Sequence, residues 1–171
     1  LGSAEPTPSS AAPLNSATPP VRPREPVPNP WATVPRELAR LLGKSNHGGG
    51  IDKKEIASVH QYNAKHPTDP RGHLLLARGY LNRHWFKDAV GEYAIALEVN
   101  QDARGDPRML PDLVRLVEFG SNDAAKMITD IYADTAASAI DRALSSPPNP
   151  EAKSRLERLK ADLPPPSPRS L

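Results

Sequence analysis

Apolar residues recur at helical spacing through most of the chain, and the clearest example lies between His73 and Asn100. The first apolar stripe in this stretch comprises Leu74, Leu75, Ala77, Tyr80 and Leu81. The second comprises Phe86, Ala89, Val90, Tyr93, Ala96 and Leu97. Each stripe follows the spacing of one face of a helix. Because only a short polar break separates them, the pattern predicts two antiparallel neighbours, an αα-hairpin.

The same spacing predicts six further helices, over residues 31–42, 52–66, 106–120, 123–134, 135–144 and 149–163. Asp52, with Glu55 three residues later, matches a reciprocal capping box, and Asn149 is placed to cap the last helix. Thr33 is expected to cap the first helix and Gly43 to end it. No alternating run of Val, Ile and Thr indicates a strand, so the sequence predicts an all-α fold.

The hairpin resembles one repeat of the tetratricopeptide family, whose period is about 34 residues. The matching positions are Leu76, Ala77, Tyr80, Ala89, Tyr93 and Ala96. His73 and Gln101 depart from the pattern, because the family has an aromatic residue and a closing proline there. Residues 31–66 resemble a second, irregular repeat, and the later helices resemble HEAT-like pairs. The resemblance implies a short α-solenoid of antiparallel helix pairs, and a compact helical bundle is the alternative.

Proline divides the chain into a folded part and two tails. Residues 1–30 contain nine prolines among Ser, Ala, Thr and Glu, and residues 164–171 are also rich in proline. Segments of this composition bury too little apolar surface to offset the entropy of ordering them. The sequence therefore predicts a disordered linker over 1–30, one helical domain over 31–163 and a disordered tail over 164–171.

Composition narrows the classes of partner and site. The formal net charge is +2, and acidic and basic residues are mixed along the chain, which argues against nucleic-acid binding. The chain has no cysteine, which excludes disulfides and thiolate zinc sites. No apolar run reaches the roughly 18 residues of a membrane span, so none is predicted. These features leave the compartment open, with the cytoplasm favoured.

Motifs for catalysis and metal binding are missing from the sequence. None of the five histidines belongs to an HExxH motif, and no Gly-rich phosphate loop follows a strand. Residues 47–50 match an esterase oxyanion motif, but the G-x-S-x-G nucleophile turn that such an enzyme needs is absent. We therefore expect no enzymatic activity, no cofactor and no metal site.

The resemblance to tetratricopeptide arrays implies a partner-binding groove lined by the first helix of each repeat. By their position in the repeat, the groove residues are Arg71, Leu74, Arg78, Asn82, Arg108, Asp112 and Arg115. Arg78 and Asn82 are four residues apart and share one helix face. Since the guanidinium fork of arginine matches a carboxylate, we expect a protein or peptide partner that is acidic. The alternative is that these arginines are ordinary solvated side chains.

These observations favour a non-catalytic scaffold or adaptor domain. A Pro-rich spacer ahead of such repeats is similar to the regions appended to bacterial, myxobacterial-type serine/threonine kinases, although the chain has no kinase motif. The alternatives are a homodimerisation appendage and a ligand-sensing appendage of such a kinase. Trp85 lies at the turn of the hairpin, where we expect it to cover a helix end.

Overall fold

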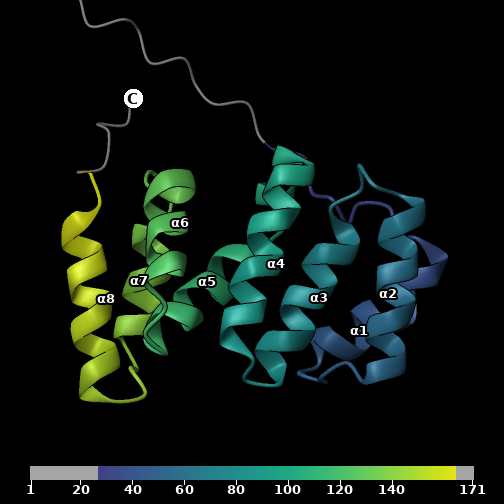
Figure 1. The fold of residues 1–171 in the computed structure, drawn as a ribbon. Helices are drawn as coiled ribbons and strands as arrows, with labels where there is room; N and C mark the ends of the chain where they lie inside the picture. The colour runs from purple at the N-terminus through teal and green to yellow at the C-terminus, as the bar shows by residue number, and fades with distance from the viewer. Residues whose placement is uncertain (1–26, 165–171) are drawn as a thin grey trace, which may run out of the picture.

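The computed structural model describes residues 27–164, and eight α-helices fill most of that range (Figure 1). The elements are α1 (Arg36–Asn46), α2 (Lys53–Lys65), α3 (Arg71–Asn82), α4 (Phe86–Val99), the 3-10 helix η1 (Gln101–Gly105), α5 (Met109–Glu118), α6 (Asn122–Tyr132), α7 (Ala137–Leu144) and α8 (Pro150–Asp162). No β-strand occurs among the described residues, which confirms the all-α class. Of the predicted tails, residues 1–26 and 165–171 lie outside the described range.

Side-chain caps define several helix starts as the sequence predicts. Asp52 Oδ1 accepts a hydrogen bond from the Glu55 backbone N–H at 2.9 Å, and Glu55 Oε2 accepts one from the Asp52 N–H at 2.8 Å. This capping box begins α2, while Ser121 and Asn149 cap α6 and α8. Lys44 Nζ of α1 donates to Glu55 at 2.7 Å and, together with the Asp52 N–H, lowers the pKa of Glu55 to about 2. The same carboxylate thus caps α2 and joins it to α1.

The first helix differs from its predicted span. It begins after Pro35 rather than after Thr33, without a side-chain cap, and it continues past Gly43 to Asn46. Gly43 does not end the helix because its backbone is not left-handed. The left-handed glycine is Gly48, with φ of 80°, which stands just beyond the helix where a terminating glycine belongs.

Two hydrophobic clusters form the core, and α3 belongs to both. Leu75 and Leu76 of α3 pack with residues of α1 and α2. Leu74 and Leu81, also on α3, pack in the larger cluster with residues of α4 to α8. Trp31, ahead of α1, packs against both clusters. Figure 1 accordingly places α3 inside the row of helices, between α2 and α4.

Small side chains lie where α3 and α4 meet. Ala77, Ala89 and Ala96 are fully buried in the larger cluster, and so is the ring of Tyr93. No other pair of helices among the described residues has so extensive a contact. The short side chains let the two backbones approach closely, and the tyrosine fills the space beside them.

Candidate functional site

Three of the sequence-predicted partner residues lie inside the domain. Leu74, Arg78 and Asp112 have exposed fractions of 0, 3 and 6%. Arg78 forms an ion pair with Asp106, and its Nη1 donates to Asn46 Oδ1 at 3.1 Å. These side chains are therefore occupied by contacts within the chain. Of the three, Arg78 also lines a cavity of about 300 Å³ together with Arg108.

A buried polar cluster surrounds Arg78, and the sequence analysis did not find two of its members, Asp106 and Tyr93. The Tyr93 hydroxyl donates to Asp112 Oδ2 at 2.6 Å, and Arg78 Nε lies 3.9 Å from the same oxygen. Burial raises the pKa of Asp112 and the pKa of Tyr93 above their usual values. One arginine thus faces two carboxylates, and the cluster joins α3, α4 and the start of α5.

Two further predicted residues also make their contacts within the chain. Arg71 forms an ion pair with Asp69 at 2.6 Å and donates from Nη1 to the Thr33 carbonyl oxygen at 2.6 Å. Asn82 Nδ2 donates to the Ser45 carbonyl oxygen at 3.1 Å. Both side chains therefore fasten the N-terminal part of the described chain to α3.

Only Arg108 and Arg115 of the predicted set are exposed. The Arg115 guanidinium carbon lies 5.9 Å from the centroid of the Phe119 ring. The structure brings Arg78 and Asp112 together in the buried cluster, but it does not assemble the seven residues into one surface.

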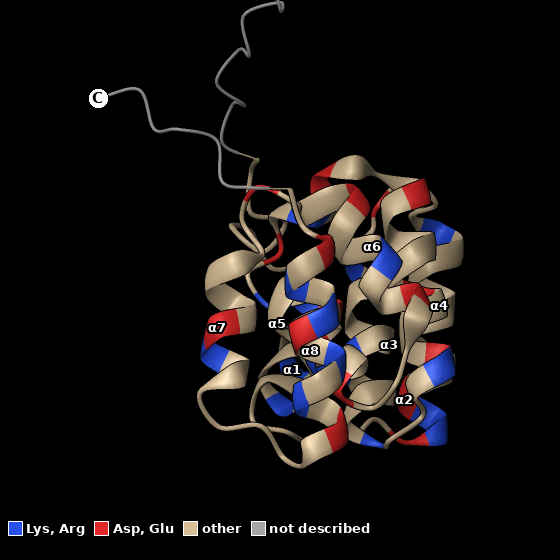
Figure 2. Cartoon of the chain, turned by 90° about the vertical axis from the view of Figure 1, so that its left-hand side faces the viewer, with Lys and Arg blue, Asp and Glu red and all other residues tan. Residues whose placement is uncertain are grey.

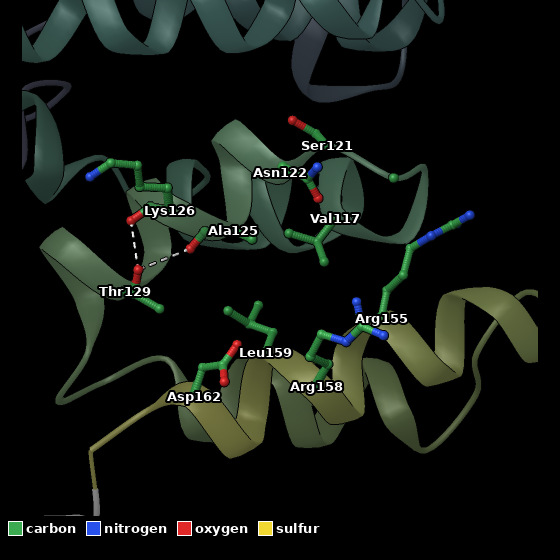
Figure 3. Close-up of a pocket in the computed structure, with 11 residues that line it drawn as sticks. Val117, Ser121, Asn122, Ala125, Lys126, Thr129, Arg155, Arg158, Leu159 and Asp162 are labelled. Carbon is green, nitrogen blue, oxygen red and sulfur yellow. Dashed lines mark hydrogen bonds between the residues drawn. The ribbon is translucent and has the colours of Figure 1, made fainter.

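A groove between α6 and α8 has a volume of about 440 Å³ (Figure 3). We call it the α6–α8 groove. Its lining residues are Val117, Gly120, Ser121, Asn122, Ala125, Lys126, Thr129, Arg155, Arg158, Leu159 and Asp162. Val117 of α5 and Leu159 of α8 give it an apolar floor, and in Figure 3 the side chains of Asn122, Arg158 and Asp162 lie beside that floor.

Helical periodicity explains both walls of the groove. On α6 the lining positions are Asn122, Ala125, Lys126 and Thr129. On α8 they are Arg155, Arg158, Leu159 and Asp162. Each set spans eight residues at the spacing of one helix face, so each wall is about 10 Å long. Thr129 and Asp162 lie at the same end in Figure 3, so the two walls run in the same direction.

The helix α5 holds the two walls apart. It packs against both α6 and α8, whereas α6 and α8 have little direct contact with each other. The buried residues of α6 are Ala124 and Ile128, and those of α8 are Ala152, Leu156 and Leu159. Val117 and Leu159 at the base of the groove are each 3% exposed, and the small Ala125 leaves room above them on the α6 wall.

Cations predominate among the groove side chains. Lys126, Arg155 and Arg158 line it, against one carboxylate, Asp162. In Figure 2, which views the molecule from the α8 end, basic positions on α6 and α8 face the reader. The groove therefore offers more positive than negative charge to whatever enters it.

The three groove cations differ in how they are held. Lys126 pairs with Asp130 at 2.5 Å on an exposed surface. Arg155 Nη1 donates to the Glu118 carbonyl oxygen at 2.8 Å, which satisfies the C-terminal end of α5, and its Nη2 pairs with Glu151. Arg158 is exposed and has no hydrogen bond or ion pair with any residue in 27–164.

A second cavity continues the groove past the turn between α5 and α6. It has a volume of about 370 Å³ and shares Gly120, Ser121 and Asn122 with the groove. Phe86 and Phe119 line it with ring centroids 4.2 Å apart, and Phe119 is 45% exposed. Gly120, with φ of 93°, provides the left-handed backbone that this turn requires.

Trp85, which the sequence places at the turn of the hairpin, packs against its neighbours in the chain. Its ring lies 5.7 Å from that of Tyr80 on α3, and the Arg83 guanidinium carbon lies 5.3 Å from its centroid. Trp85 remains 44% exposed. It therefore packs over the end of α3, as expected, and does not line the groove.

The α6–α8 groove was not predicted from the sequence because its lining residues come from three helices and the turn between α5 and α6. One signal was present: Arg155, Arg158 and Asp162 repeat at helical spacing beside the apolar Leu159.

Within residues 27–164, no helix is long and apolar enough to cross a membrane. No three His, Cys, Asp or Glu side chains of that range cluster as a metal site would require.

No family model, curated sequence or solved structure matches this chain, so the support for its function lies in the geometry and chemistry of the groove and the buried cluster.

Proposed function

We propose that this chain is a non-catalytic protein-interaction domain whose α6–α8 groove binds a segment of a partner protein. The observation that carries the proposal is the groove itself, with an apolar floor between two helical walls of polar and charged side chains. Helical domains commonly recognise peptides in this way, since the floor accepts apolar side chains and the rim sets their orientation. The proposal includes a scaffold or adaptor role within a larger bacterial signalling protein.

The size of the groove suits a short segment. A wall of about 10 Å corresponds to two turns of helix. An occupant of that length buries much less than the roughly 1,200 Å² of a stable protein interface, so we expect transient binding. The adjoining cavity at Phe86 and Phe119 extends the surface available to a longer segment.

The likeness of residues 70–100 to a tetratricopeptide repeat favours the same class of function, and we retain that kinship as part of the proposal. The site differs from the one that the resemblance implies. The proposed groove lies on α6 and α8, whereas the family pattern pointed to residues on α3 and α5.

Filling the groove is expected to abolish binding. Peptides from a random display library are selected on the full chain, and their affinities are measured by fluorescence anisotropy. Ala125→Arg places a long side chain in the groove, so we expect at least a roughly 10-fold loss of affinity, which corresponds to about 1.4 kcal/mol. Thr129→Arg, one turn further along the same wall, is expected to have the same effect.

Ala57→Arg is the matched control, because Ala57 is an exposed position on α2, outside the groove. All three variants should keep the helical circular-dichroism signal. The proposal fails if every selected peptide binds Ala125→Arg and Thr129→Arg as tightly as it binds the control.

A further inference from the structure

We propose that the segment bound in the α6–α8 groove is acidic, with a carboxylate paired to Arg158 and an apolar side chain on the floor formed by Val117 and Leu159. This inference rests on the proposed function and names the chemistry of the partner. It is carried by the charge of the groove and by the different ways in which its cations are held.

Arg158 provides the strongest indication of an acidic partner. It lies on the groove wall one residue before Leu159 of the floor, and no acceptor within residues 27–164 engages its guanidinium group. A guanidinium group offers a planar fork of donors that fits both oxygens of a carboxylate. A carboxylate bound there stands directly beside the apolar floor.

The other two cations can also turn to a partner. Lys126 and Arg155 pair with Asp130 and Glu151, and at least two fifths of each of these four side chains is exposed. Exposed pairs at this helical spacing contribute little stability, so a carboxylate of a partner can replace the local one. Arg155 keeps its bond to the Glu118 carbonyl oxygen while its Nη2 stays available.

The single carboxylate of the groove gives the site a direction. Asp162 lies one helical turn beyond Arg158 on the same wall. An acidic residue of the partner is therefore favoured near Arg158 and disfavoured near Asp162. The segment that fits has an acidic end, an apolar residue in the middle and a neutral or basic residue at its other end.

The composition of selected peptides tests this chemistry. The display library encodes acidic and basic residues at equal frequency, and clones are kept only if Ala125→Arg abolishes their binding. We expect these groove-dependent clones to be enriched in Asp and Glu beside an apolar residue. If they are neutral or basic, the inference is overturned while the proposed function stands. If no clone depends on the groove, both are overturned.

A charge exchange then locates the pair. Arg158→Glu in the full chain is expected to weaken a selected acidic peptide about 10-fold, and a peptide with its acidic residue changed to Lys should lose as much with the wild-type chain. Combining the two changes should restore most of the affinity. Arg142→Glu is the control, because Arg142 is exposed on α7 outside the groove. The inference fails if Arg142→Glu weakens binding equally, or if the exchanged pair does not recover.

Discussion

Replacing Arg78 with alanine is expected to destabilise the folded domain by about 3–5 kcal/mol, because the change leaves a buried carboxylate without its counter-ion. Arg78 is 3% exposed, and its partner Asp106 is equally buried. Asp106→Ala leaves the buried guanidinium group without its carboxylate, and it should lower the free energy of unfolding by a similar amount. Since whole domains are stable by only about 5–15 kcal/mol, either variant loses a large part of the total.

The measurement is urea unfolding of the full chain, followed by circular dichroism. Arg40→Ala is the control: Arg40 pairs with Glu55 at 3.1 Å, but its side chain is 73% exposed, so the expected loss is below about 1 kcal/mol. Equal stabilities for Arg78→Ala and Arg40→Ala would contradict a structural role for the buried pair.

Leu74→Ala is expected to cost about 2–5 kcal/mol, because it removes buried methyl groups and leaves a cavity that the core fills only in part. Leu74 is fully buried where α3 faces the larger cluster. In the sequence analysis the same residue belonged to the partner groove, so this variant separates the two interpretations. A groove residue could be truncated with little effect on the stability of the free domain.

Ile95→Ala on α4 is the matched control, since Ile95 is 39% exposed and its truncation should cost less than about 1 kcal/mol. Both variants are compared in the same urea titration. A Leu74→Ala loss as small as that of Ile95→Ala would show that α3 is not packed as described.

The fold was predictable where local chemistry decides the structure. The Asp52 and Glu55 pair and Asn149 define helix starts through contacts within three residues, and both predictions are confirmed. The all-α class follows from the same local periodicity. The 3-10 helix η1 was missed because it is a short element with little apolar periodicity.

The predicted site depended on a contact that no local pattern reveals. Whether an arginine on a helix is solvated or buried is decided by its partner, and for Arg78 that partner is Asp106, 28 residues later in the chain. The four-residue spacing of Arg78 and Asn82 indicates only that they share a face. The structure shows that this face is buried against Asn46, Ser45 and Asp106.

The residues of the α6–α8 groove, in contrast, were not predicted as a site. They come from three helices, and the groove exists because α5 separates α6 from α8. From the sequence, Arg155 and Arg158 look like ordinary surface residues of a charged helix. Their chemistry becomes informative only when the structure places Val117 of α5 and the lining residues of α6 beside them.

Amide chemical-shift mapping tests the central claim, that the partner binds between α6 and α8, most directly. The ¹⁵N-labelled full chain is titrated with a selected acidic peptide. The account predicts that the largest shifts fall within residues 117–129 and 155–162, with small changes over 71–82. The claim is contradicted if the largest shifts fall over 71–82 and 108–115 and α8 shows none.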